Sequence, residues 1–277
     1  IDVLNKRENR KAEYLTPKVN RDALKDKTLT FSNAGTELIL EKVLSKSNFK
    51  LNDKEVANGI HHHHDGVNRE RNKILGNQYK IGDGIFVLSN AEKNAIPFTK
   101  EELKLIKPSY TSKELYRWFG NPINQEWVIY TDSSFRDKKK IENYPNIKKH
   151  LDQFKKVITS DNKPYGLHRS RDERFFLGEK IVAIRKCAKP TFTFVDFDSY
   201  VSATFYVIKT DRLNQKYLTG LLNSELMAFW LRYKGKMQGN NYQIDKEPIM
   251  ALPILNADQT KQSPIVNIVD KILALTK

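Results

Sequence analysis

The chain has 277 residues, 39% of them hydrophobic, so it can bury a substantial core as one large domain or two small ones. Lys and Arg total 48 against 33 Asp and Glu, and the formal charge of +15 favours a polyanionic partner such as nucleic acid, although many basic proteins bind none. The single cysteine, Cys187, excludes an intramolecular disulfide and a cysteine-based zinc site and fits a reducing cytoplasm, and no apolar run is long enough to span a membrane.

The chain begins with a polar stretch. Residues 1–35 carry scattered charges and few apolar positions, and they predict a connector or extended arm ahead of the core. The segment TELILEKVLSKS then places two apolar pairs at helical spacing, Ile39 with Val43 and Leu40 with Leu44. We therefore expect a helix here, with an apolar face that packs inward.

The next third of the chain predicts short strands and capped helices. The segment YKIGDGIFVLS indicates two strands around a tight turn at Gly82–Gly84. Thr99 with Glu102 and Thr111 with Glu114 have the capping-box spacing, in which each side chain bonds a free backbone donor, so helices are expected after both. The segment QEWVIYTD predicts another strand.

A further helix is predicted to begin at Pro145, because proline suits the first helical turn. Its apolar positions share one face: Ile147, Leu151, Phe154 and Ile158. Lysines occupy the other faces, and a solvated surface is their simplest interpretation.

The C-terminal half mixes strand and helix patterns without a βαβ rhythm. The segments EKIVAIRKC, PTFTFVDFD and YVSATFYVIKT are rich in β-branched and aromatic residues and predict successive strands. Two helical segments follow, and Ser224 between them is predicted to cap the second. YQIDKEPIMALPIL predicts a return to strand, and Pro264 is predicted to open a last helix. We predict an α+β fold: a mainly antiparallel twisted sheet with packed helices in a single domain, residues 36–277, in which residues 255–277 form the closing helix.

Motifs of the common enzyme classes are absent. The 12 glycines include no GxGxxG or GxxxxGK[ST], and GxSxG and HExxH are also missing. A metal-dependent nuclease stays open as an alternative, because Glu102 and Lys104 with Asp83 upstream have the bare carboxylate and lysine pattern that such an enzyme needs. Matches of this kind arise easily by chance when 29% of the residues are charged.

Four consecutive histidines, His61 to His64, stand in the segment GIHHHHDGVN. An expression tag would normally sit at a terminus, and adjacent side chains point apart, so they converge poorly on one metal ion. We favour an exposed loop that, with Arg69 and Arg71, donates hydrogen bonds to phosphates or base edges. A solvated loop without a partner stays open.

Several separated segments carry a family resemblance. In chain order they include VANGIHHHHDGVNRE, LIKPSYTSKELYRWF, YGLHRSRDERFFLGEKIVAIRKC and YLTGLLNSELMAFWLRYKGK. From about residue 36 to 277, the sequence resembles the C-terminal specificity domain of TaqI-like N6-adenine DNA methyltransferases and type IIG restriction-modification enzymes. HRSRD and LLNSELMAFWLRYKG are the clearest matches.

The resemblance implies a target-recognition domain for double-stranded DNA, which positions a methyltransferase and, in some enzymes, an endonuclease. Catalytic domains of this family carry an S-adenosylmethionine fold and a [DNS]-P-P-[YFW] motif, but this chain has no Pro-Pro pair. We expect no catalytic residue, no metal ligand and no cofactor here; S-adenosylmethionine and Mg²⁺ are expected in catalytic domains of the same polypeptide or complex. The opening IDVLNKREN lacks an initiator methionine, which indicates a fragment or a separately encoded subunit.

Charge, the resemblance and hydrogen-bonding capacity together select the candidate DNA contacts. Between Thr131 and Lys189, sixteen basic residues stand against eight acidic ones, more than half of the net excess. Arginine suits guanine, and Asn or Gln suits adenine, although a Gly-Asn-Asn turn explains Asn240 and Asn241 equally well. The candidates are His61, His62, His63, His64, Arg69, Arg71, Lys138, Lys139, Lys140, His168, Arg169, Arg171, Arg174, Lys234, Lys236, Asn240, Asn241 and Gln243. A single-stranded RNA-binding module is a second alternative, if the aromatic residues of TFTFVDF lie exposed on a sheet.

Overall fold

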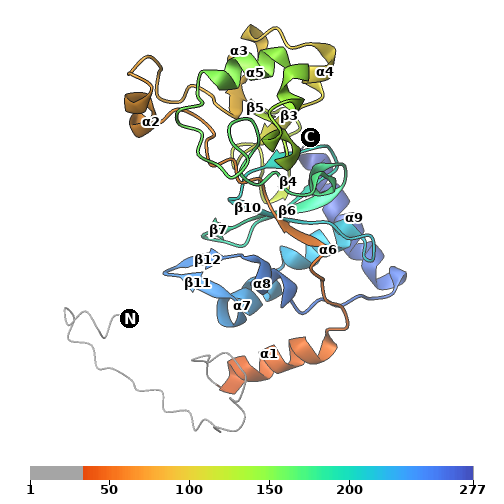
Figure 1. The fold of residues 1–277 in the computed structure, drawn as a ribbon. Helices are drawn as coiled ribbons and strands as arrows, with labels where there is room; N and C mark the ends of the chain where they lie inside the picture. The colour runs from red at the N-terminus through yellow and green to blue at the C-terminus, as the bar shows by residue number, and fades with distance from the viewer. Residues whose placement is uncertain (1–33, 277) are drawn as a thin grey trace, which may run out of the picture.

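The β-branched and aromatic segments near residues 180–208 form the centre of the molecule. The computed structural model describes residues 34–276, and five strands make its largest sheet (Figure 1). In spatial order these are β1 (Val56–Asn58), β10 (Phe205–Ile208), β6 (Lys180–Ile184), β8 (Phe192–Val195) and β4 (Trp118–Phe119).

Successive side chains of a strand point to opposite faces of its sheet. In the central sheet, both faces pack against a hydrophobic core. On β6, Ile181 and Ala183 pack into one hydrophobic core and Val182 into the other. On β10, Val207 and Ile208 separate in the same way. The two cores therefore share one sheet, which agrees with the prediction of a single domain.

A second sheet and several short helices cover one face of the central sheet. The strands, in spatial order, are β2 (Val87–Ser89), β5 (Glu126–Ile129), β3 (Ile106–Tyr110) and β9 (Tyr200–Val201). The helices are α2 (Arg69–Ile74), α3 (Asn90–Ala95), α4 (Lys100–Leu103) and α5 (Pro145–Asp152). Ile147 and Leu151 of α5 are fully buried as predicted, but the helix ends at Asp152, so Phe154 and Ile158, which are also buried, lie beyond it.

The C-terminal helices cover the other face. They are α6 (Gln215–Leu222), α7 (Glu225–Lys234), α8 (Lys246–Met250) and α9 (Gln259–Leu275), together with the N-terminal α1 (Ala34–Lys46). A small third sheet of β7 (Lys186–Cys187), β12 (Asn241–Gln243) and β11 (Lys236–Gln238) lies beside them. Ser224 caps α7 as predicted, and its side chain accepts a hydrogen bond from the Met227 amide.

The strand pairs are antiparallel except for two. β3 runs parallel to β9 and β4 parallel to β8, and each of these pairs joins only two residues per strand. The predicted α+β fold with a mainly antiparallel sheet and a C-terminal helix is confirmed. Among residues 34–276, no helix is long and apolar enough to cross a membrane. The predicted connector falls almost wholly on residues 1–33, which lie outside the described part of the chain.

The Glu102 side chain connects the N-termini of α4 and α5, beside the second sheet. Its carboxylate completes the predicted capping box of α4 by accepting from the Thr99 amide at 2.8 Å. It also accepts from the Asn146 amide at 2.6 Å, the Asn146 side chain at 2.8 Å and the Ile147 amide at 3.1 Å, at the start of α5. One fully buried carboxylate thus satisfies free donors of both helices.

Two local predictions, for the segments around Thr111 and Gly82, are wrong. The Glu114 carboxylate accepts from the Thr111 amide as in a capping box, but the Thr111 hydroxyl accepts from the Lys113 amide instead of that of Glu114, and only a turn follows before Leu115 pairs with Gly120 in a β-bridge. Around Gly82–Gly84 only the second strand forms, as β2, and the residues before Gly82 make a turn.

Three features near the termini also differ from the prediction. The segment after β12 folds into α8 instead of continuing as a strand, and α9 begins at Gln259, before Pro264. On α1 only Leu40 is buried, whereas Ile39 and Leu44 are about half exposed. Val43 packs partly buried against the core, so two of the four predicted inward-facing positions, Leu40 and Val43, are covered.

Candidate nucleic-acid interface

Two distant segments of the sequence meet in one short β-bridge. The His61 amide donates to the Arg169 carbonyl at 3.0 Å, and the Arg169 amide donates back to the His61 carbonyl at 3.1 Å. The histidine stretch and the HRSRD segment therefore lie side by side. We call the exposed and half-buried residues at this junction the His–Arg surface: His61, His63, His168, Arg169 and Arg171.

Three imidazole rings gather on this surface. The His168 ring centroid lies 4.9 Å from that of His61 and 5.2 Å from that of His63. Partial burial lowers the pKa of His61, and the charges of His168, His63, Arg171 and Arg169 lower it further, so the His61 ring is neutral at pH 7 and the arginines carry the positive charge of this surface. Within the part of the chain that the structure describes, no three His, Cys, Asp or Glu side chains are arranged to hold a metal ion.

The other two histidines of the stretch point inward, and the prediction that they contact DNA from an exposed loop is wrong. His62 and His64 are 9% and 3% exposed. Burial lowers the pKa of each to about 4, and the charge of Arg71 contributes at His64. Both rings are therefore neutral at pH 7.

Arg71 stabilises the histidine segment through hydrogen bonds to its backbone. Its guanidinium donates to the His63 carbonyl at 2.7 Å and to the Gly66 carbonyl, and it lies 3.6 Å from the Asp65 carboxylate. Arg69, at the first turn of α2, is exposed and has no ion-pair partner among the described residues. Of this predicted pair, Arg71 is committed to the loop and Arg69 is available to a ligand.

Arg171 is a strained residue that joins the HRSRD segment to the end of β1. Its φ of 71° lies in the left-handed region that non-glycine residues rarely adopt. Its guanidinium donates to the Gly59 carbonyl at 3.2 Å and lies 3.4 Å from the Asn58 side-chain oxygen. Gly59 itself has no room for a side chain, since a Cβ there would lie 2.1 Å from the Ser202 carbonyl oxygen. Arg169, by contrast, is exposed, and its side chain has no partner among residues 34–276.

The remaining basic candidates divide into free and paired groups. Lys138 and Lys139 are exposed, and their side chains form no ion pair or hydrogen bond with the described residues. The side chain of Lys140 donates to Ser134, and that of Arg174 pairs with Asp172 at 2.7 Å. Lys180, which contributes to the basic excess of the sequence, is fully buried and is no part of the surface.

The candidates near the C-terminus lie on or beside the hairpin of β11 and β12. Lys234 pairs with Glu37 at 3.4 Å, and Lys236 pairs with Glu247 at 2.8 Å. The Gln243 amide donates to Asp245 at 2.6 Å. Asn240 lies in the two-residue turn and Asn241 opens β12, which agrees with the turn interpretation of this sequence and leaves base recognition open.

The residues proposed for the two alternative functions, a metal-dependent nuclease and an RNA-binding module, have structural roles instead. The Glu102 carboxylate is occupied by four donors at two helix ends, and Lys104 pairs with Glu101 at 2.7 Å, so they do not form a nuclease site. Phe192 and Phe194 of TFTFVDF are 0% and 4% exposed, and Phe197 is partly buried against the core, so the segment presents no row of exposed aromatic rings for RNA bases.

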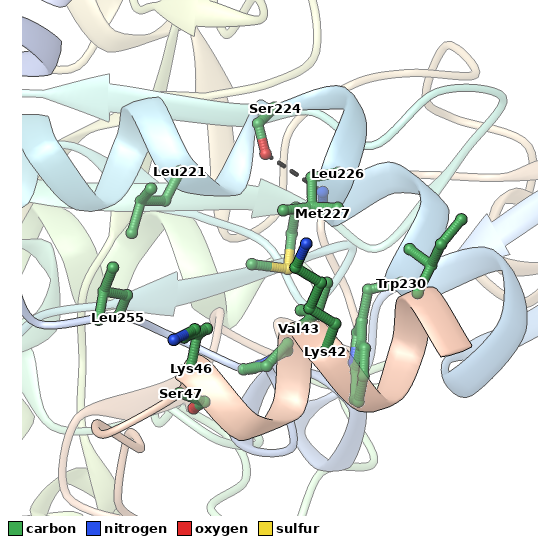
Figure 2. A pocket seen from close by; sticks show the side chains of 12 residues that line it. Lys42, Val43, Lys46, Ser47, Leu221, Ser224, Leu226, Met227, Trp230 and Leu255 are labelled. Atoms are coloured by element: carbon green, nitrogen blue, oxygen red, sulfur yellow. Dashed lines mark hydrogen bonds between the residues drawn. The ribbon is translucent and has the colours of Figure 1, made fainter. Parts of the chain in front are cut away.

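An apolar groove of about 510 Å³ lies between α1 and the α6–α7 pair. Figure 2 shows Met227 and Trp230 pointing toward α1, where Val43 and Lys42 face them. Exposed apolar side chains flank the groove, including Ile39, which also lines it. Apart from serine hydroxyls and two lysines it offers no polar side chain, so it fits an apolar partner surface better than a polyanion.

Comparison with known families agrees with this geometry. Residues 107–254, more than half of the chain, match the model of the TaqI-like C-terminal specificity domain. The chain belongs to the TaqI-like C-terminal specificity domain family. The match includes the HRSRD segment and the β11–β12 hairpin and begins after the four histidines.

Two solved structures resemble this specificity domain. One is the type IIL restriction-modification enzyme MmeI in complex with DNA, with 16% identity, a TM-score of 0.54 and coverage of 82% of this chain. The other is the type IIG restriction endonuclease BpuSI, with 13% identity, a TM-score of 0.45 and 86% coverage. The chain spans 28% of the length of each. A comparison with curated proteins gave no match.

Sequence reasoning missed the residues that connect the interface. Asn58 and Gly59 accept hydrogen bonds from the Arg171 guanidinium. Arg185 connects the hairpin to the turn before β10: its side chain donates to Asp245 at 2.6 Å, and its amide donates to the Thr204 carbonyl at 3.0 Å. Lys186, next to it, is exposed and unpaired within residues 34–276. The Asn-Gly pair ahead of the histidines is the one local signal that could have indicated a close approach.

Proposed function

We propose that this specificity domain recognises a short sequence in double-stranded DNA on behalf of a restriction-modification enzyme. The family match over residues 107–254 carries the proposal. The His–Arg surface supports it, because it joins exposed basic side chains from two distant segments. The net charge of +15 favours the same kind of partner.

Phosphate contacts set the register of such a domain on DNA, and base contacts supply its specificity. Arg69, Lys138, Lys139 and Arg169 suit phosphate best, since no acidic side chain of the described chain competes for them. Cations held in ion pairs, such as Arg174, must first give up a carboxylate. His61 and His63 add hydrogen-bond donors beside Arg169.

The catalytic chemistry belongs, in this proposal, to partner domains of the same polypeptide or complex. These domains would bind S-adenosylmethionine for adenine N6 methylation, and Mg²⁺ where an endonuclease is attached. The specificity domain would position the methyltransferase and brace the duplex while the target adenine is flipped out of the stack. The groove between α1 and α7 offers an apolar surface for contact with such a domain. We assign the protein to the cytoplasm, where its free cysteine remains reduced.

Salt-dependent binding to duplex DNA tests the proposal. We expect the logarithm of affinity to fall linearly with the logarithm of salt concentration, and Arg169→Ala to reduce that slope by about 1 if the side chain contacts one phosphate. Lys271→Ala is the control, because Lys271 on helix α9 is exposed and has no ion-pair partner within residues 34–276. Equal effects of the two substitutions, or stronger binding to single-stranded RNA than to duplex DNA, would contradict the proposal.

A further inference from the structure

The β11–β12 hairpin is a narrow two-stranded ribbon at the edge of the molecule. Three residue pairs join its strands: Lys236 with Gln243, Met237 with Tyr242, and Gln238 with Asn241. Gly239 takes a φ of 58° in the two-residue turn, a conformation that glycine adopts without strain. Figure 1 shows the hairpin extending to the left, the side on which α2 also extends.

Contacts at its base fix the direction of the ribbon. β12 pairs with β7, where Tyr242 stands opposite Cys187. Asp245, just after β12, accepts from the Arg185 guanidinium at 2.6 Å and from the Gln243 amide at 2.6 Å. Such bracing holds the tip in place before a ligand binds.

The tip itself carries unused amide groups. The side chains of Gln238, Asn240 and Asn241 form no hydrogen bond with any other residue of the described chain. Gln238 and Asn240 are exposed and Asn241 is partly exposed. Three neutral amides at the end of a ribbon on a strongly basic protein gain little from phosphate charge, but each can donate and accept at once.

The ribbon and the His–Arg surface flank the same turn, residues 202–204. The Arg185 amide donates to the Thr204 carbonyl at 3.0 Å on one side. On the other side, the Ala203 amide donates to the Ile60 carbonyl at 2.7 Å, next to His61. A DNA backbone held by the His–Arg surface would therefore lie near the ribbon.

We infer that the tip of the β11–β12 hairpin enters the major groove and reads adenine through the amides of Asn240 and Asn241. The major groove admits a two-stranded β-ribbon, and an Asn amide matches the N6 donor and N7 acceptor of adenine. The inference rests on the proposed function and adds to it the reading element and the base.

Selection of a randomised duplex library tests this inference. Wild-type chain should enrich a motif with at least one fixed A·T pair, and Asn240→Ala with Asn241→Ala should relax that position about 5- to 150-fold, the range expected for one bidentate contact. Asn94→Ala is the control, since Asn94 is an exposed asparagine on α3 whose side chain bonds to no other residue in the described part of the chain. Replacing the adenine by 7-deazaadenine, which lacks the N7 acceptor, should weaken wild-type binding and leave the double variant unaffected.

The outcomes separate this inference from the proposed function. An unchanged motif in the double variant overturns the ribbon as the reading element while duplex recognition stands. A wild-type motif without adenine overturns the choice of base. Failure of wild-type chain to enrich any motif contradicts both.

Discussion

Substitution of Glu102 tests the assignment of this carboxylate to the fold and not to a metal. In Glu102→Gln one oxygen can still serve the Asn146 and Ile147 amides, but an NH₂ group would face the Thr99 amide and the Asn146 side chain. Each buried donor left without an acceptor costs about 1–3 kcal/mol. With two such donors, we expect the free energy of unfolding to fall by about 2–6 kcal/mol, a large part of the stability of an ordinary domain.

The neighbouring Glu101→Gln is the matched control. Glu101 pairs with Lys104 on the exposed side of the same helix, so its loss should cost no more than about 1 kcal/mol. Urea unfolding followed by circular dichroism measures both variants. Similar stabilities for the two, or magnesium-dependent DNA cleavage by the wild-type chain that a folded Glu102→Gln variant lacks, would refute the structural role.

The same residue predicts an acid-dependent loss of stability. Burial alone would raise the pKa of Glu102, but hydrogen bonds from Asn146, Thr99 and Ile147 outweigh it and hold the pKa below its usual value. Because the folded-state pKa is depressed, the contribution is complete above pH 4.5 and is lost as the pH falls through the folded-state pKa. Stability profiles of wild type and Glu102→Gln should therefore converge in acid; a constant gap from pH 7 to pH 3 would contradict this account.

Further outcomes follow for the histidine loop and its support. Arg171→Ala should weaken binding to all DNA sequences alike, because its guanidinium holds the Gly59 carbonyl; a change confined to one base position would instead mean that it reads a base. Gly59→Ala should lower the free energy of unfolding by about 1–3 kcal/mol, since a Cβ would collide with the neighbouring backbone, and a wild-type urea midpoint would refute this. Burial lowers the pKa of His62 from 6.5 to about 4, so its contribution to stability should fall by up to about 3 kcal/mol between pH 6.5 and 4; His62→Gln should make the profile less steep there, while His64, lowered in the same way, keeps its own contribution.

The histidine stretch shows what the sequence could and could not reveal. Residues 60–64 alternate between buried and exposed, with His62 and His64 inside and His61 and His63 outside, although the backbone bends at His63, whose φ is 68°. Four identical residues have no polar and apolar contrast, so the alternation is invisible in the sequence. Four consecutive histidines are equally consistent with a helix or a loop.

Segments with a clear hydrophobic pattern were predictable. The strands β6, β8 and β10 were recognised from their β-branched and aromatic residues, and α5 from its apolar spacing. Capping signals alone were weaker: Thr99 and Glu102 open a helix, whereas Thr111 and Glu114 close only a turn before a β-bridge. A capping box satisfies donors at a helix start but does not by itself supply an apolar face that packs.

The pairing of distant segments lay beyond local reasoning. Nothing near His61 indicates that its backbone will bond that of Arg169, and nothing near Asp245 indicates that it will join Arg185 to the hairpin. The family resemblance supplied the function that these pairings now support, and the pairings show which basic residues are free and which hold the fold.

Selection from a randomised duplex DNA library at near-physiological salt is the most direct test of the central claim, that this chain recognises a specific sequence. The account predicts a short enriched motif and salt-dependent affinity. Retention of DNA without any enriched motif, fading steeply as salt rises, would contradict it and leave only a general polyanion-binding surface.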